Sequence, residues 1–242
     1  MDKCIKIYPA FNIIVLIELV NRDYLFLSDN KFAMRFYHTP RFLRYLYNRD
    51  AIWQMPGKSK TLYLTFDDGP TTELTYWILD ILEEYNAKAT FFCVGANVEK
   101  HPQIFKDIIF KGHSVGNHTF NHLNGWKTET GIYCDNILKA SNLIDSHLFR
   151  PPYGKMKRSQ IKLIKELNYK TVMWSILTYD FDKELDFDEA WKNILLHTTP
   201  GSILVFHDNI KAIENIKLLL PKTLEYFSSK GFNFEKIKES EI

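Results

Sequence analysis

Two adjacent carboxylates, Asp67 and Asp68, follow the most strand-like segment of the chain and precede Gly69 and Pro70. Neighbouring residues of a regular strand point to opposite faces, so both acids can serve one site only where the strand has ended and the backbone bends. Gly-Pro supplies such a bend. One acid could then bind a metal ion while the other takes a proton from the water that the ion holds. The alternative is a solvated turn, for which Asp-Gly and Gly-Pro are ordinary residues.

Two imidazoles, His118 and His122, are four residues apart. On a helical turn this spacing places both on one side of the backbone, where they can bind a single ion. Taken alone, two histidines at this spacing are as consistent with a structural role as with metal binding. Adding Asp68 gives three protein ligands and leaves a position for water, which is typical of catalytic rather than structural zinc sites. His113 lies off that face, and we expect a structural role for it.

The remaining candidate residues also follow predicted strands. Arg150 and Tyr153 follow the fourth, Asp180 follows the fifth, and His207 follows the sixth. In parallel α/β barrels the loops after the strands converge on the active site. We expect Asp67 to be a general base and His207 a general acid, because imidazole titrates near neutral pH. An amide nitrogen leaves only when it is protonated, so a dedicated acid suits amide hydrolysis.

Short β-branched or aromatic runs alternate with longer segments of helical period. Strands are predicted over residues 61–65, 90–94, 114–116, 148–150, 170–174, 202–206 and 233–236. Helices are predicted over residues 74–85, 102–110, 129–146, 159–167, 187–197 and 213–229. Pro221 should kink or split the last helix. This alternation predicts a parallel sheet, and seven repeats predict closure or near-closure into an α/β barrel.

Length and composition fit one such domain. The chain has 242 residues, and an α/β barrel of ~200–250 residues would use nearly all of it. A hydrophobic content of 45% and a formal charge of +2 are ordinary for a soluble enzyme and do not indicate a nucleic-acid partner. Three widely spaced cysteines argue against a disulfide framework, and Cys93 is expected in the core.

The first 60 residues are predicted to be an extension and lead-in, with the catalytic domain over residues 61–242. Residues 1–33 show no clean periodicity and precede Met34, a possible alternative start. Residues 34–60 carry six basic residues against one acid. They could form a membrane-surface or polyanion-binding arm, but a short helix over residues 40–48 that packs on the barrel is favoured.

Localisation is predicted from the absence of clear targeting signals. The apolar stretch over residues 13–19 is far shorter than the ~20 residues that span a bilayer. No small-residue cleavage site follows it, as a signal peptide would require. We therefore expect no transmembrane segment and a cytoplasmic enzyme.

Four motifs together resemble those of NodB-like polysaccharide deacetylases, carbohydrate esterase family four. They are Thr-Phe-Asp-Asp-Gly-Pro over residues 65–70, His118-Thr-x-x-His122, Arg150-Pro-Pro-Tyr153 and the hydrophobic-x-His that ends at His207. The resemblance covers residues 62–237. It implies a distorted (β/α)7 barrel and metal-dependent removal of acetyl groups from N-acetylated sugars or, in some members, O-acetylated sugars.

The resemblance also implies a role for each matching residue. Asp67 resembles the general base, and Arg150 resembles the residue that holds its carboxylate, for which a bidentate guanidinium is suited. The backbone N–H of Tyr153 would stabilise the oxyanion. His207 resembles the acid, with Asp180 holding its imidazole and raising its pKa.

The implied metal ligands are Asp68, His118 and His122. The expected ion is Zn²⁺, with Co²⁺ or another divalent ion as the alternative.

The departures from the family pattern lie near the acid. Where the family often reads Asp-x-x-Asp-Trp, this chain reads Leu177-Thr-Tyr-Asp180-Phe181. Val205 stands where a leucine often lines the acetyl pocket. These changes leave the metal ligands and the base intact and affect the shape of the pocket.

We therefore expect a hydrolase that removes acetyl groups from N-acetylated hexosamine units of a polysaccharide, oligosaccharide or glycolipid. An O-acetyl esterase or a deacylase of a non-carbohydrate amide would use the same site. A non-catalytic glycan-binding protein is a third hypothesis. Acetate release from N-acetyl and O-acetyl substrates separates the first two, and sugar binding without turnover would indicate the third.

Overall fold

The computed structural model describes residues 37–39, 44, 47–48, 50–57 and 59–242. Residues Tyr37–Ile242 form one compact unit. The segment Met1–Phe36, with Met34 and the apolar stretch over residues 13–19, lies outside the described residues, as does most of the helix predicted over residues 40–48.

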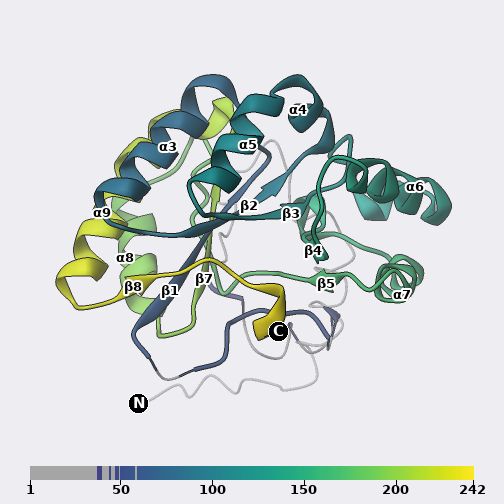
Figure 1. Cartoon of the computed structure of the whole chain (residues 1–242). Helices are drawn as coiled ribbons and strands as arrows, with labels where there is room; N and C mark the ends of the chain where they lie inside the picture. Colours follow the sequence, from purple (N-terminus) through teal and green to yellow (C-terminus); the bar gives the residue numbers. More distant parts are fainter. Residues whose placement is uncertain (1–36, 40–43, 45–46, 49, 58) are drawn as a thin grey trace, which may run out of the picture. The chain divides into compact units, whose positions relative to one another are not determined.

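A curled parallel sheet forms the centre of this unit (Figure 1). Its strands are β1 (Thr61–Asp67), β2 (Ala89–Cys93), β3 (Ser114–Asn117), β4 (Leu148–Phe149), β5 (Lys170–Thr171), β6 (Ile176–Leu177), β7 (Ile203–His207) and β8 (Asn233–Phe234). Their order is β5-β4-β3-β2-β1-β7-β6, with β8 paired to β1. This arrangement confirms the predicted α/β fold of the distorted (β/α)7 type.

Strand β1 occupies the middle of the sheet and is buried along nearly its whole length. It pairs with β2 on one side and with β7 on the other, and Asp67 lies opposite both Phe92 and His207. One face of β1 is apolar, with Leu62, Leu64 and Phe66, whereas the other carries Thr65 and Asp67 toward the site. The register therefore brings the ends of β1 and β7 side by side.

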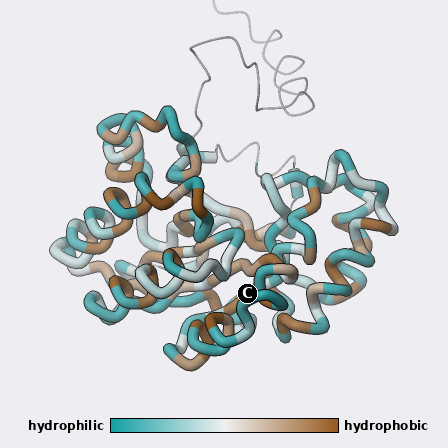
Figure 2. Tube along the Cα trace, turned by 90° about the horizontal axis from the view of Figure 1, so that it is seen from above, coloured by the Kyte–Doolittle hydropathy of each residue, from teal (hydrophilic) through white to brown (hydrophobic). Residues whose placement is uncertain are grey.

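Helices surround the sheet (Figure 1). They are α3 (Thr72–Glu84), α4 (Gly95–Lys100), α5 (Pro102–Phe110), α6 (Thr130–Ser141), α7 (Arg158–Glu166), α8 (Phe187–His197) and α9 (Ile213–Ser229). In Figure 2 hydrophobic positions recur at intervals along the coils with hydrophilic positions between them, as expected of helices with one buried face. In α3 the buried face includes Leu74, Ile78 and Leu82.

Three elements differ from those predicted. Helix α4 was not predicted, because six residues with only Gly95 and Val98 buried are too short for a periodic signal. The predicted fifth strand is short, and a separate strand, β6, follows it. Pro221 was predicted to kink or split the last helix, and because α9 continues through it as one element, the helix is not split. Its apolar face is buried on both sides of the proline, which holds the two halves together.

The described part of the lead-in completes the sheet. Within the described residues no pairing joins β5 to β6. Instead Ile52 forms a parallel bridge with Val172, and His38 forms an antiparallel bridge with Ile176. The N–H of Ile52 donates to the carbonyl of Thr171 at 2.9 Å. Residues of the lead-in thus form hydrogen bonds with backbone groups beside β5 and β6 that a direct β5–β6 pairing would otherwise use.

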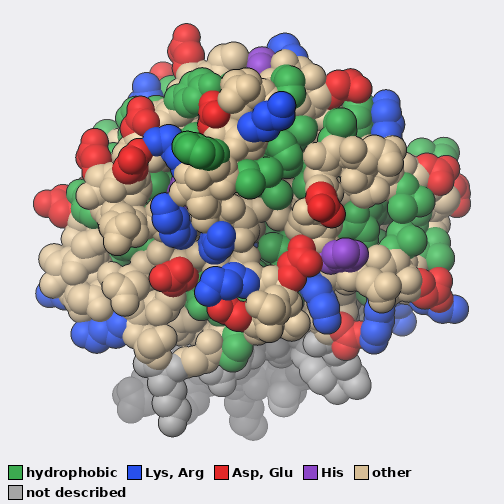
Figure 3. Space-filling view, in the orientation of Figure 1, with side chains coloured by type: hydrophobic (Ala, Val, Ile, Leu, Met, Phe, Trp, Pro, Cys, Tyr) green, Lys and Arg blue, Asp and Glu red, His purple; other side chains and the backbone are tan. Residues whose placement is uncertain are grey.

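Among the described residues, no helix is both long and apolar enough to cross a membrane. On the face shown in Figure 3, charged side chains of both signs are interspersed.

Removing the lead-in should destabilise the domain. A chain that begins at residue 59 loses the bridges of Ile52 and His38 and the buried side chains of Tyr37 and Met55. Burial of two such side chains stabilises by about 3–6 kcal/mol, so we expect the melting temperature to fall by about 6–24 °C. The full chain is the reference. Equal melting temperatures for the two chains would contradict this account.

Candidate active site

The two adjacent aspartates diverge because the strand ends between them. Asp67 is the last residue of β1, and Asp68 has a positive φ of 81°. This left-handed conformation is unusual for residues other than glycine, although Asp tolerates it better than most. As predicted, both carboxylates then face one region at the end of the strand.

Asp67 forms a buried ion pair with Arg150. Nη1 of the arginine lies 2.7 Å from Oδ1 of the aspartate, and the arginine side chain is fully buried. Burial lowers the pKa of Arg150, whereas the carboxylate of Asp67 acts to raise it. The guanidinium therefore depends on this carboxylate as the counter-ion for its charge.

Arg150 also donates hydrogen bonds to β1 and to the segment that follows β5. Nη1 also donates to Oγ1 of Thr65 at 2.8 Å, Nε donates to the carbonyl of Val172 at 3.1 Å, and Nη2 donates to that of Met173 at 2.9 Å. The guanidinium lies over the ring of Phe92, 4.1 Å from its centroid. These contacts fix the position of the group that holds Asp67.

Three potential metal ligands converge beside this pair. One ligand atom each from Asp68, His118 and His122 lie within 4.8 Å of one another. Nε2 of His122 is 3.0 Å and Nε2 of His118 is 3.6 Å from Oδ1 of Asp68. That oxygen is buried and accepts no hydrogen bond from the described residues. A buried carboxylate oxygen without a donor, facing two imidazole nitrogens, fits a bound divalent cation.

Hydrogen bonding sets the tautomer of His118. Its Nδ1 lies 2.7 Å from the carbonyl oxygen of Arg150, which can only accept. Nδ1 therefore carries the proton, and Nε2 presents its lone pair to the candidate cation position. Arg150 thus contacts the base through its side chain and orients a metal ligand through its backbone.

The backbone between the two histidines is not the helical turn that we predicted. Thr119 and His122 have positive φ values of 62° and 54°. The N–H of Thr119 donates to Oδ1 of Asn117, and the N–H groups of Phe120 and Asn121 donate to Oδ1 of Asn136. Side-chain acceptors replace the helical hydrogen bonds. The two imidazoles still converge, but through this irregular loop.

The charge of Asp68 is stabilised within the site. Burial raises the pKa of this carboxyl, but contacts with His118 and His122 and the proximity of His207 outweigh burial and hold the pKa well below its usual value. The group is therefore ionised, as a metal ligand must be.

His207 and Asp180 form a second charged pair. Nδ1 of the imidazole lies 2.7 Å from Oδ1 of Asp180, and the backbone N–H of His207 donates to Oδ2 at 2.7 Å. Burial lowers the pKa of His207, but the charge and hydrogen bond of Asp180, together with Asp68 and Asp67, raise it to about 9. The ring of Phe181 packs edge-on against the imidazole.

Tyr153 borders the site from the loop after β4. It has a positive φ of 61°, its side chain is 56% exposed, and its ring lies 4.7 Å from that of His122. Among the described residues its backbone N–H donates to no protein acceptor. This group is therefore available to a ligand.

The structure brings together all eight predicted site residues. Several contacts were not predicted, including those of Thr65 with Arg150, of Asn97 with the backbone of Asp68, and of Asn209 with the side chain of Asp68. Asn209 directly follows His207-Asp208 and begins a turn, which was the one available signal for it. Asp180 follows β6 rather than the fifth strand, because β6 is an additional element.

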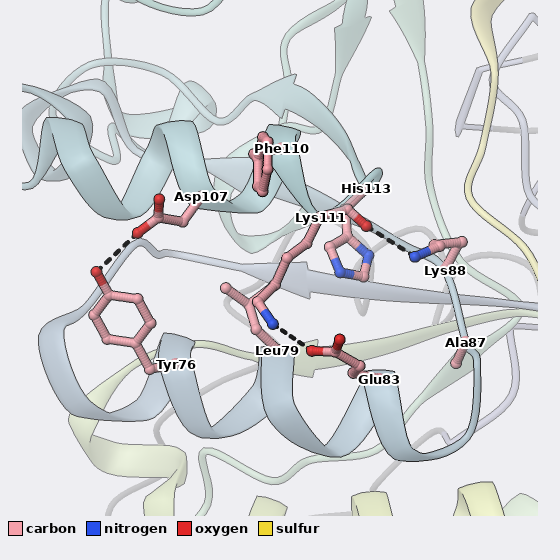
Figure 4. Close-up of a pocket in the computed structure, with 9 residues that line it drawn as sticks. All are labelled: Tyr76, Leu79, Glu83, Ala87, Lys88, Asp107, Phe110, Lys111 and His113. Atoms are coloured by element: carbon pink, nitrogen blue, oxygen red, sulfur yellow. Dashed lines mark hydrogen bonds and ion pairs between the residues drawn. The ribbon is translucent and has the colours of Figure 1, made fainter.

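A separate pocket lies at the opposite ends of the strands (Figure 4). His113 lies in it, directly before β3, and accepts a hydrogen bond at Nδ1 from the N–H of Ala89. This contact confirms the structural role predicted for His113. Cys93 is fully buried, also as predicted.

The sequence of this chain is similar to those of known deacetylases. The family described as polysaccharide deacetylase matches residues 54–172. A peptidoglycan-N-acetylglucosamine deacetylase of Bacillus cereus is 36% identical and aligns over 74% of this chain and 67% of its own length. A second protein of that name and organism is 32% identical over 77% of this chain and 91% of its own. The chain belongs to the polysaccharide deacetylase family.

A solved structure supports the same relationship. The peptidoglycan N-acetylglucosamine deacetylase Bc1960, in complex with a small-molecule benzamide derivative, superposes with a TM-score of 0.72 and 35% identity. The match covers 78% of this polysaccharide deacetylase chain and 91% of the other. The predicted family, fold class and enzyme class are thereby confirmed.

Replacing Arg150 with methionine should strongly destabilise the protein. The change leaves the buried charge of Asp67 without its partner, which costs about 3–5 kcal/mol, or about 6–20 °C in melting temperature. Lys165→Met is the matched control, because the Lys165–Asp50 pair has the same 2.7 Å separation but is exposed. Water and salt screen the charges of an exposed pair, so its loss should change the melting temperature little. Equal melting temperatures for both variants would refute the importance of the buried pair.

Replacing Asp180 with asparagine should lower the pKa of His207. The carboxylate favours the imidazolium, so its removal allows burial to dominate, and we expect the pKa to fall from about 9 by about 1–3 units. NMR titration of the imidazole in metal-free protein measures this directly. In the enzyme, the alkaline limb of the pH–rate profile should move to lower pH. An unchanged imidazole titration would exclude this role for Asp180.

Proposed function

We propose that this polysaccharide deacetylase hydrolyses the N-acetyl group of N-acetylglucosamine units in peptidoglycan or its fragments, using Zn²⁺. The related proteins above are named for this substrate. The observation that carries the proposal is the convergence of Asp68, His118 and His122 within 4.8 Å, beside the Asp67–Arg150 pair. A protein that only binds glycans would not need this combination of ligands, base and acid.

The donor set supports zinc as the ion. Two imidazole nitrogens and one carboxylate oxygen are typical of catalytic zinc sites, which keep a position free for water. Co²⁺ can occupy similar sites, and competition between the two ions tests the choice. When bound, such a cation lowers the pKa of a coordinated water and polarises the acyl oxygen of the substrate.

Asp67 is proposed to accept a proton from the attacking water. Its carboxylate is buried, held by Arg150 at 2.7 Å, and adjacent in sequence to the ligand Asp68. A fixed base beside the attacking oxygen contributes about 10²–10⁴-fold to the rate. Arg150 orients the carboxylate and takes no proton, because a guanidinium stays charged.

His207 is proposed to donate a proton to the departing nitrogen. It lies opposite Asp67 on the adjacent strand, and Asp180 favours its protonated form. Water adds to the acetyl carbon, the carbon–nitrogen bond breaks, and the nitrogen receives the proton from His207, so the products are acetate and a free amino sugar. The backbone N–H of Tyr153, which has no protein acceptor among the described residues, is proposed to stabilise the developing oxyanion.

Variants at the base and at a ligand should separate catalysis from metal binding. Asp67→Asn keeps an acceptor for Arg150 but removes its counter-ion, so the protein should melt at a lower temperature. Below that temperature it should still bind metal while acetate release falls at least about 100-fold. His118→Ala should lose both metal and activity. Acetate assays and metal analysis of purified protein measure these outcomes. Full activity of Asp67→Asn would show that another group is the base.

The substrate class can be tested with peptidoglycan fragments, chitooligosaccharides and O-acetylated sugars in one assay. We expect acetate release from N-acetylglucosamine units, with a free amine located on that sugar by mass spectrometry. Faster turnover of O-acetyl substrates would instead favour an esterase. Saturable binding without turnover in the presence of Zn²⁺ or Co²⁺ would favour a non-catalytic glycan-binding protein.

The compartment is proposed to be the cytoplasm. Mature wall polymer lies outside the membrane, so a cytoplasmic enzyme would act on precursors or recycled fragments. Fractionation of the native host with an antibody to the protein tests this, and detection only outside the membrane would refute it.

A further inference from the structure

The turn after β7 holds the carboxylate of Asp68 through Asn209. Nδ2 of Asn209 donates to Oδ2 of Asp68 at 2.5 Å. We propose that Asn209 is a positioning residue, which fixes this carboxylate so that Oδ1 alone faces the two imidazoles. The inference rests on the proposed function, in which Asp68 binds the metal.

The orientation of the Asn209 amide is determined by its other end. Its Oδ1 accepts hydrogen bonds from the N–H groups of Lys211 and Ala212, at 2.9 and 3.2 Å. An amide placed the other way round would turn its NH₂ group toward two N–H donors and its oxygen toward a carboxylate. Only one orientation satisfies both ends, so the donor must point at Asp68.

The two oxygens of Asp68 are therefore inequivalent. Oδ2 accepts the hydrogen bond from Asn209, whereas Oδ1 is buried and accepts none from the described residues. The backbone of Asp68 is also fixed, because Nδ2 of Asn97 donates to its carbonyl at 2.7 Å. Side chain and backbone are thus both held, which leaves Oδ1 as the atom presented to an ion. Such partners of metal ligands commonly change metal affinity about 10–100-fold.

Asp208 attaches this turn to the loop after β1. Its carboxylate is fully buried and accepts hydrogen bonds from Oγ1 of Thr71 and Oγ1 of Thr75. Its backbone N–H donates to the carbonyl of Asp67 at 2.7 Å. A side chain at Gly69 would collide with this carboxylate. The distance over which Asn209 must reach Asp68 is therefore set by buried contacts.

A purely structural role for Asn209 is the competing explanation. Its Oδ1 caps the short helix η3 (Ile210–Ala212), and Asn is a favoured capping residue. Serine can also cap a helix, but it lacks the amide group and is too short to reach both partners. Asn209→Ser therefore keeps the cap and removes the contact with Asp68, whereas Asn209→Ala removes both.

The test measures metal affinity and stability separately in the full-length protein. After removal of metal, Zn²⁺ binding is followed by calorimetry and Co²⁺ binding by visible absorption. We expect both variants to bind these ions about 10–100-fold more weakly than the unmodified chain. Both variants lose the hydrogen bond to Asp68, but only Asn209→Ala also loses the cap, so in metal-free protein it should melt about 2–4 °C below Asn209→Ser. Activity lost at low metal should recover at saturating Zn²⁺, with KM for the glycan unchanged.

Asn193→Ser is the matched control. Asn193 lies on α8, and among the described residues its side chain donates only to the carbonyl of Glu189 on the same helix. This variant should bind metal normally. If Asn209→Ser also binds Zn²⁺ and Co²⁺ normally, Asn209 is a cap only and the inference is wrong. If the unmodified chain binds neither ion, the proposed metal-dependent function itself fails, which is a distinct result.

Discussion

The buried ion pair of Arg150 and Asp67 is the interaction on which the rest of the site depends. A fully buried guanidinium is tolerated only when a counter-ion and hydrogen-bond acceptors surround it. Arg150 finds them on β1 and in the segment after β5, and its own carbonyl orients His118. Arg150 thus links the end of β4 to the base and to the segment that the lead-in completes through its side chain, and to a candidate ligand through its backbone.

The two groups proposed to move protons lie against partners of opposite charge. Asp67 is held by a cation, and His207 is held by an anion, Asp180, on neighbouring strand ends. The parallel register of β1 and β7 places Asp67 beside His207, but each contacts a different charged partner. Burial strengthens both pairs, because the effective dielectric constant inside a protein is lower than that of water. Asn209 extends this arrangement to the metal ligand Asp68.

The lead-in belongs to this arrangement although it precedes the first strand. Ile52 pairs with Val172, whose carbonyl accepts a hydrogen bond from Arg150. The described part of the lead-in therefore lies in the same compact unit as the site. Arg44 and Tyr47, which lie in the helix predicted over residues 40–48, are helical, but the bridges of His38 and Ile52 were not predicted because isolated bridges leave no periodic signal in a sequence. The shortening of β5 and the extra strand β6 went unpredicted for the same reason.

The sequence by itself determined the residue types of the site, their order along the chain and the alternation of strands and helices. Because parallel strands present their carboxyl ends at one edge, this was enough to predict that Asp67, Asp68, His118 and His207 would meet. Only the tertiary structure decided the conformation between the two histidines, the completion of the sheet by the lead-in, and the contact of Asn209 with Asp68. These features depend on single hydrogen bonds between residues distant in sequence, which neither periodicity nor motif spacing encodes.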